Sequence, residues 1–387
     1  MSILIWVALW LGALTAGTIV GTFSRARERR WAVVGALSVA FVGAVGLGLS
    51  TSWGAHATTV GPFLVDSVVS TVAPTMLLGA LALVLLAGRA EATGPESSWL
   101  LVILAVESVA LASSSFGLLV AAEIGAAALL ADHARRNGHR AQVAYLLLTL
   151  GLLVAAAVTW GMGLDPRVSA WLSVGAALVR LGVFPLSTGI LASLQQGTST
   201  ATLMAALPFG GVMLLLRAAP ILEGASVPVL RFLLVAAPVA AALSILQREL
   251  GRSIGYVLVA VHALIAVGAL APSTEGHLGA ELLWAGALLT STGFGAAANL
   301  VTLRIGNPDL DRHHGLHGSA PFLSLAFLVL GVGLAGGPGT IEFVAEDVLL
   351  NTTAADGVLG MAMVVLAIEL IGFNMLRLHY RLFFGAR

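Results

Sequence analysis

The sequence predicts an all-α, polytopic membrane helix bundle of about 13 transmembrane helices, two of them discontinuous and arranged as an inverted repeat. Three observations lead to this fold. Apolar residues make up 58% of the 387-residue chain and charged residues only 10%, whereas a soluble domain has about 25% charged residues. Apolar stretches of about 17 to 25 residues follow one another almost without gaps. Two of these stretches are interrupted by Gly and Pro, about five spans apart, as an internal repeat would place them.

The predicted spans alternate with connections that differ in basic residues. They lie near residues 3–23, 31–50, 66–88, 98–114, 116–132, 141–162, 168–194, 199–219, 227–247, 252–271, 277–303, 320–350 and 357–384. Every second connection is rich in Arg, beginning with Arg25, Arg27, Arg29 and Arg30. Because short basic loops stay in the cytoplasm, we expect an integral protein of a bacterial inner membrane with its N-terminus outside and its C-terminus in the cytoplasm.

No polar linker or soluble domain interrupts the spans, so residues 1–387 are expected to form a single integral-membrane domain. Its expected parts are N-terminal helices (1–97), a first repeat (98–220), a second repeat (221–356) and a C-terminal helix (357–387). The formal net charge of zero argues against a nucleic-acid partner. The absence of cysteine excludes disulfides, iron–sulfur ligation and thiolate zinc sites. We expect no cofactor and no metal.

The two interrupted spans place charged residues beside the interruption. In the first, Gly182 and Pro185 follow Arg180. In the second, five glycines surround Pro338, and three carboxylates come directly after it: Glu342, Glu346 and Asp347. Non-helical backbone at membrane depth is tolerated only where protein or water covers it, and transporters build ion sites there. The alternative is that each Pro only kinks a continuous helix.

Several spans contain an ionisable residue near the middle, where a charge costs at least about 2.5 to 3.5 kcal/mol on insertion scales. The expected proton or ion path consists of Glu123, Arg180, Glu342, Glu346, Glu107 and Glu369. Glu107 could instead be a packing or interhelical hydrogen-bond residue. Glu369 is expected to be buried together with Asn374, and Glu281 is expected to extend to the membrane surface. An HHxxH cluster at residues 313–317 suits metal ligation but is interpreted as a solvated loop.

Five stretches resemble the antiporter-like membrane subunits of the NADH:quinone oxidoreductase (respiratory complex I) and Mrp-type Na+/H+ antiporter family. GLAGGPGTIEFVAEDVLL (333–350) is similar to the Gly-Leu-Pro-Gly-Thr…Phe-x-x-Glu element of that family. Residues 177–208, 247–264 and 378–385 resemble further family segments in the same order, and LLVAAEIGAAALL (118–130) resembles the helix with the family's glutamate. The resemblance covers residues from about 98 to 387.

Carried over residue by residue, the resemblance assigns Glu123 to the family's channel carboxylate and Glu346 to its Phe-x-x-Glu carboxylate. Arg180 stands where the family has a lysine, Ser187 replaces a histidine, and Phe209 (or Pro208) stands where the eighth helix has its lysine. All 19 basic residues are Arg, and Arg cannot release a proton in a useful range. We therefore expect Arg180 to hold Glu123 as a fixed ion pair and the central relay to be interrupted.

The resemblance implies a proton-translocation-type membrane subunit of a complex I-like or Mrp-like assembly, degenerate in its lysines. Such a subunit would couple ion movement to electron transfer in partner subunits and would at most be a non-redox part of a translocase. Its expected partners are other membrane subunits and the lipid bilayer. Two alternatives stay open: a stand-alone secondary ion transporter with a site made of Glu123, Arg180 and Glu346, and a non-conducting structural scaffold.

Overall fold

A computed structural model describes residues 3–53, 57–86, 95–194, 209–354 and 357–385, and nearly all of them are helical. The first part of the chain contains α1 (Ile3–Phe23), α2 (Ala26–Ser50), β1 (Thr58–Val60), β2 (Phe63–Val65), α3 (Ser67–Leu86), α5 (Pro95–Leu111), α6 (Phe116–Arg136), α7 (Arg140–Gly161), α8 (Pro166–Leu181) and α9 (Thr188–Leu194). The second contains α11 (Phe209–Leu222), α12 (Val227–Ile245), α13 (Leu250–Leu270), α14 (Thr274–Ile305), the 3-10 turn η1 (Leu316–Gly318), α15 (Pro321–Leu334), α16 (Ile341–Ala354) and α17 (Val358–Phe383). The short antiparallel hairpin of β1 and β2 was not predicted.

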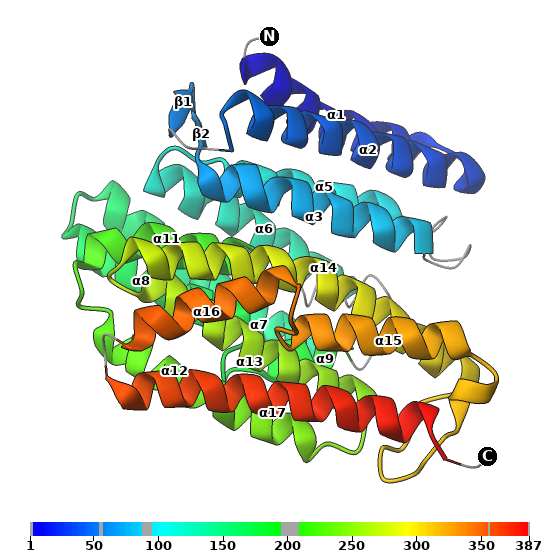
Figure 1. The fold of residues 1–387 in the computed structure, drawn as a ribbon. Helices are drawn as coiled ribbons and strands as arrows, with labels where there is room; N and C mark the ends of the chain where they lie inside the picture. The colour runs from blue at the N-terminus through cyan, green and yellow to red at the C-terminus, as the bar shows by residue number, and fades with distance from the viewer. Residues whose placement is uncertain (1–2, 54–56, 87–94, 195–208, 355–356, 386–387) are drawn as a thin grey trace.

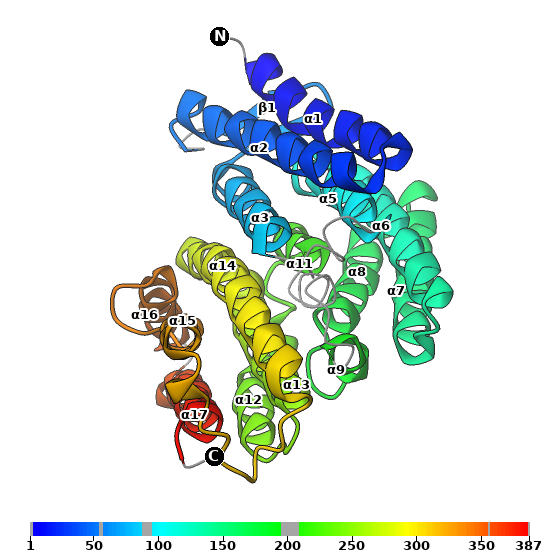
Figure 2. The same cartoon turned by 90° about the vertical axis from the view of Figure 1, so that its right-hand side faces the viewer.

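The helices lie side by side along one common direction, and α1 begins at one end of the bundle while α17 finishes at the other (Figure 1). Viewed along the helices, α1 and α2 form an outer layer, α5 to α11 form one side, and α12 to α17 form the other (Figure 2). Helix α13 lies inside the bundle, where every residue from Val257 to Leu270 is buried. Its neighbours are α12, α14, α11 and α9.

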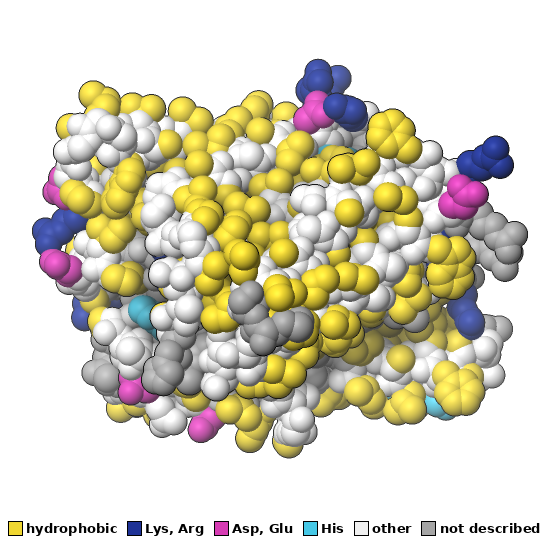
Figure 3. All heavy atoms as spheres, turned by 90° about the horizontal axis from the view of Figure 1, so that it is seen from above, with side chains coloured by type: hydrophobic (Ala, Val, Ile, Leu, Met, Phe, Trp, Pro, Cys, Tyr) yellow, Lys and Arg dark blue, Asp and Glu magenta, His cyan; other side chains and the backbone are white. Residues whose placement is uncertain are grey.

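The outside of the bundle is apolar. Among the described residues, nine helices are long and apolar enough to cross a membrane, and three shorter apolar helices accompany them. Large apolar side chains such as Phe23, Phe322 and Leu303 are more than 70% exposed. Seen from the α1–α2 side, hydrophobic side chains cover the middle of the surface, and the visible charged groups lie at its rim (Figure 3). A surface of this kind fits lipid rather than water, so the chain is an integral membrane protein. The count of thirteen spans stays a prediction.

Both predicted interruptions are present. Helix α8 ends at Leu181, Gly182 has a φ of 60°, and the next helix begins only at Thr188. Helix α15 ends at Leu334, and α16 begins at Ile341 after a segment with positive φ at Gly336 and Gly339. Glycine is favoured at these positions because side chains clash in the left-handed region. The alternative of two merely kinked helices is wrong, since the helical hydrogen bonding stops over 182–187 and over 335–340.

Candidate functional site

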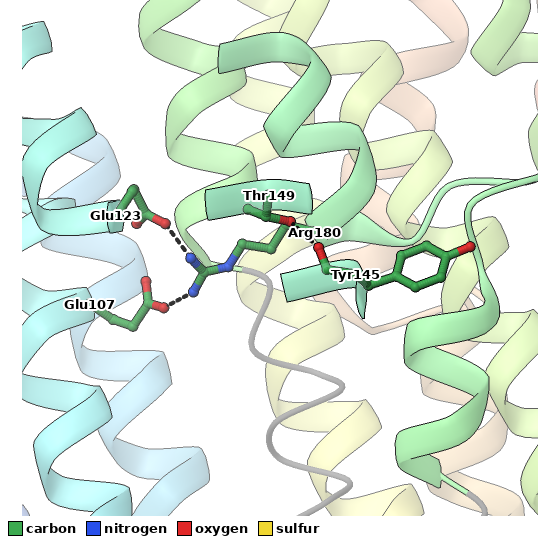
Figure 4. Close-up of polar contacts among 5 residues, drawn as sticks. All are labelled: Glu107, Glu123, Tyr145, Thr149 and Arg180. Atoms are coloured by element: carbon green, nitrogen blue, oxygen red, sulfur yellow. Dashed lines mark hydrogen bonds and ion pairs between the residues drawn. The ribbon is translucent and has the colours of Figure 1, made fainter. Parts of the chain in front are cut away.

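The guanidinium of Arg180 lies between two buried carboxylates. Its Nη1 donates to Glu123 Oε2 on α6, and its Nη2 donates to Glu107 Oε1 on α5 (Figure 4). The three side chains are 4%, 0% and 1% exposed for Arg180, Glu123 and Glu107 respectively. The predicted pair of Glu123 and Arg180 is therefore confirmed. Glu107 is an interhelical hydrogen-bond residue, as its alternative interpretation expected, and its partner is the same guanidinium.

The break after α8 positions Arg180. It occupies the last turn of α8, where a cation is favoured by the helix dipole. The exposed carbonyls of such a helix end need partners. Val183 N donates to Leu178 O, and His262 Nδ1 of α13 lies 3.0 Å from Leu181 O. His262 was not singled out from the sequence, because only the fold brings it to this helix end.

Polar groups continue from Arg180 toward the second half of the broken helix. Figure 4 shows Thr149 and Tyr145 of α7 on the side of Arg180 away from the two glutamates, with the Tyr145 ring pointing away from the guanidinium. Thr149 Oγ1 donates to the Tyr145 carbonyl at 3.0 Å, and the Tyr145 hydroxyl is hydrogen-bonded to Thr188 at the start of α9. Helix α7 packs against both α8 and α9, on the two sides of the gap, and its polar link is to α9.

Glycine makes room for the carboxylate of Glu123. A Cβ built on Gly210 of α11 would overlap both carboxylate oxygens of Glu123. A backbone without a side chain therefore approaches the charged group directly. The same arrangement recurs at the second break, where a Cβ on Gly336 would overlap the carboxylate of Glu346.

The charges of the Arg180 cluster leave one carboxylate in excess. If Glu107 and Glu123 are both ionised, the cluster has a net charge of −1, and one proton makes it neutral. Glu107 Oε2 and Glu123 Oε1 are buried without a hydrogen-bond partner among the described residues. Because a net charge in a dry interior is unfavourable, the cluster is suited to hold one exchangeable proton.

A second group of carboxylates lies on α16, directly after the second break. Glu342 and Glu346 are 2% and 6% exposed. Thr290 of α14 donates its hydroxyl to Glu342 Oε1 at 2.6 Å. Gly286 lies against the same side chain, since a Cβ there would come within 2.7 Å of the carboxyl carbon of Glu342. Within the described part of the chain, no ion pair or hydrogen bond joins this group to Arg180, so Glu123, Arg180 and Glu346 do not form one common site.

Glu369 differs from its prediction. It is exposed on α17, whereas Asn374 is fully buried and donates to Ser253 Oγ at 3.0 Å. Residues three or four apart share a helix face, and residues five apart do not. The expectation that Glu369 and Asn374 are buried together is therefore wrong.

Glu281 was expected to reach the membrane surface and is instead buried. It is 4% exposed on α14 and accepts a hydrogen bond of 3.1 Å from Ser67 Oγ at the start of α3. The adjacent Asp66 pairs with Arg217 of α11 at 2.6 Å. The contact between Ser67 and Glu281 joins residues 214 positions apart, and no local pattern signals it.

The remaining candidates lie outside this network. Ser187 is buried in the first gap. Pro208 and the side chain of Phe209 lie outside the described residues, so an interrupted central relay stays a prediction. In the HHxxH loop, His314 Nε2 lies 3.0 Å from the Asp309 carbonyl and His313 contacts Arg381. No group of three His, Asp or Glu side chains suited to a metal ion occurs where the structure describes the chain.

Comparison with known proteins supports the resemblance read from the sequence. A family model described as "NADH:quinone oxidoreductase/Mrp antiporter, TM" matches residues 166–372. No curated protein matches the chain significantly. Many solved structures share its fold, among them chains of three membrane complexes. A chain of respiratory complex I from Thermus thermophilus has a TM-score of 0.82 at 19% identity, with 97% of this chain and 89% of that chain covered.

The other two are similar in fold at comparable identity. A chain of the Mrp complex from Dietzia sp. DQ12-45-1b has a TM-score of 0.79 at 17% identity, over 98% of this chain and 80% of that chain. A chain of the membrane-bound sulfane sulfur reductase, an archaeal respiratory membrane complex, has a TM-score of 0.82 at 16% identity, over 99% of this chain and 71% of that chain.

Proposed function

The chain belongs to the NADH:quinone oxidoreductase/Mrp antiporter family, and from this premise we propose that it is a proton-translocating membrane subunit of a larger complex. The solved structures of similar fold are titled as multi-subunit membrane complexes, which supports other membrane subunits as its partners. Electron transfer takes place in those partners, and ion movement in this chain is coupled to it. The chain itself is a non-redox part of the translocase.

The observation that carries the proposal is the pairing of one guanidinium with two buried carboxylates. Arg180 stays protonated and acts as a fixed counter-ion. The excess carboxylate of the pair formed by Glu107 and Glu123 holds the proton and exchanges it. Arginine in place of the family's lysine therefore does not by itself interrupt the path, because the proton resides on the carboxylate pair. The expectation of a fixed ion pair considered Glu123 alone. With Glu107 as a second carboxylate beside Arg180, one of the two carboxylates is free to bind a proton.

The two glutamates of α16 form the second proton-binding site in this proposal. Glu342 and Glu346 are four residues apart on one helix face and are both buried beside the second break. Two neighbouring carboxylates share protons more readily than they hold two charges. Thr290 provides a hydroxyl that both donates and accepts, so it suits proton exchange with Glu342.

The orientation is also part of the proposal, with the N-terminus outside and the C-terminus in the cytoplasm. The opposite positions of the start of α1 and the end of α17 support an odd number of spans (Figure 1). The Arg-containing connection between α14 and α15 contacts the end of α17, where His314 N donates to Arg381 O at 3.0 Å. Basic connections gathered at one end of the bundle agree with a cytoplasmic face there.

A proton-flux measurement tests the role of the carboxylate pair. The purified complex is reconstituted into liposomes with a pH-sensitive dye inside, and wild type is compared with Glu107→Gln and Glu123→Gln. Each variant removes the excess carboxylate, so flux should fall by about tenfold or more, the low end of what a positioned proton-transfer group supplies. Glu223→Gln is the control, because it removes an exposed carboxylate paired with Arg167 and should leave flux unchanged.

A non-conducting scaffold is the second candidate function, and the lack of any lysine favours it. Under that hypothesis both glutamine variants assemble into the complex and leave flux at the wild-type rate. That result would remove the proton-holding role from the Arg180 cluster.

A further inference from the structure

An acidic cavity opens between the second break and α17. It has a volume of about 370 Å³, and its lining includes Gly336, Pro338 and three carboxylates: Glu346, Asp347 and Glu369. A single water occupies about 30 Å³ in the liquid, so the cavity can accept a whole side chain. Across the described residues, none of the three carboxylates has an ion-pair or hydrogen-bond partner. Among the side chains that line it, the cavity therefore has acceptors and no donor.

Glu346 provides the independent sign of a missing ligand. It is 6% exposed, so more than nine-tenths of it is buried. Its carboxylate lies directly against the backbone of Gly336 and borders the cavity. A buried carboxylate without a donor is unfavourable, and the cavity is the direction from which a donor can reach it.

Glu369 lies at the depth where lipid is least able to solvate it. It follows the first residue of α17 by 11 positions and precedes the last by 14, which places it about 17 Å and about 21 Å from the two ends. Three exposed apolar residues share its helix face at helical spacing: Leu366, Phe373 and Leu376. Ionisable residues within membrane spans almost always face protein or a water-filled cavity. This face of α17 therefore needs a cover other than lipid.

We propose that a helix of a neighbouring membrane subunit packs on this face of α17 and inserts an Arg or Lys side chain into the acidic cavity. The occupant is basic because the cavity is acidic. Glu369 and Asp347 are exposed at its mouth, and Glu346 is buried behind them. The exposed apolar residues on either side of Glu369 supply the packing surface for the incoming helix. The inference deepens the proposed function and rests on it, since it requires the chain to be part of a membrane complex.

Co-purification tests the inference in the intact complex. The chain is affinity-tagged in a host that expresses the whole complex, extracted in mild detergent, and its bound subunits are quantified by mass spectrometry. The double variant Asp347→Asn, Glu369→Gln should lower the yield of one membrane subunit by about tenfold or more, as expected when one side of a buried charge pair is removed. Glu275→Gln removes an exposed carboxylate at the start of α14 that forms no ion pair with any described residue, and its yield should equal that of wild type.

A cross-linking step identifies the occupant. The chain contains no cysteine, so within it a benzophenone maleimide labels only Leu366→Cys, and the adduct of this chain should contain a partner helix with an Arg or Lys. Glu369→Arg should then abolish co-purification, and exchanging the partner's basic residue for Glu should restore it. Equal expression and elution volume of each variant show that the chain itself remains folded.

The outcomes separate the two proposals. If the wild-type chain co-purifies with no membrane subunit, the proposed function fails and this inference with it. If subunits co-purify but the double variant retains them within twofold, the inference is overturned and the proposed function stands. The inference is also overturned if the cross-linker forms adducts with lipid alone. It is overturned as well if the yield of the co-purified subunit depends on sodium but on no basic residue of that subunit.

Discussion

Replacing Arg180 with lysine tests whether the guanidinium joins two carboxylates. The two terminal nitrogens of Arg180 donate to different helices, Nη1 to Glu123 on α6 and Nη2 to Glu107 on α5. A lysine ammonium keeps the charge but is a point donor on a differently shaped stem, so it can serve one of the two carboxylates well. A hydrogen bond to a charged group contributes about 1.5 to 3 kcal/mol. Arg180→Lys should therefore destabilise the chain by about that amount.

A double-mutant cycle separates this loss from a general effect of the substitution. In a Glu107→Gln background only Glu123 needs a cationic partner, and Arg180→Lys should cost less than about 1 kcal/mol. The predicted coupling energy is about 1 to 2 kcal/mol. Arg180→Met, which leaves both carboxylates buried without a cation, should cost about 3 to 5 kcal/mol.

The measurement is the free energy of unfolding of the four chains of the cycle in mixed micelles, obtained from reversible SDS titration followed by tryptophan fluorescence. Arg135→Lys is the control, since its ion pair with Asp132 is largely exposed and its loss should change nothing measurable. If Arg180→Lys destabilises the wild type and the Glu107→Gln chain equally, the two-sided pairing of Arg180 is refuted.

Two glycine substitutions test the close approach of backbone to carboxylate. Gly210→Ala places a Cβ on the carboxylate of Glu123, so it should lower the free energy of unfolding by about 1 to 3 kcal/mol and reduce proton flux, and a wild-type flux would contradict the role of that contact. Gly336 has a φ of 66°, and a Cβ there would also overlap the carboxylate of Glu346, whereas Gly339 has a φ of 91° and open space around its Cβ position. In SDS titration, Gly336→Ala should therefore lower the free energy of unfolding more than Gly339→Ala does. If both variants lower it equally, only backbone strain of about 1 to 2 kcal/mol explains the loss.

The fold and both breaks could be predicted because their signals are local. Hydropathy sets the spans, and backbone that stops hydrogen-bonding at membrane depth requires Gly and Pro in the sequence. The second partner of Arg180 could not be predicted in the same way. Glu107 and Arg180 are 73 positions apart, and their contact depends on how α5 and α8 are rotated about their own axes. The exposure of Glu369 has the same cause, since packing rather than composition sets the rotation of a membrane helix.

The position of the charges, rather than their sum, links the two proposals. The chain contains 19 basic and 19 acidic residues, but most of the described basic residues lie in connections or near helix ends, whereas several carboxylates are buried inside the bundle. Among the described residues that are buried, Arg180 is the one arginine, whereas five glutamates are buried: Glu107, Glu123, Glu281, Glu342 and Glu346. Such an excess of acidic groups in a medium of low dielectric constant must be compensated by protons or by cations from another chain. The buried Arg180 cluster is suited to compensation by a proton. On α16, Glu342 is hydrogen-bonded to Thr290 and suits proton exchange, whereas Glu346 borders the open cavity and can also be compensated by a cation from another chain.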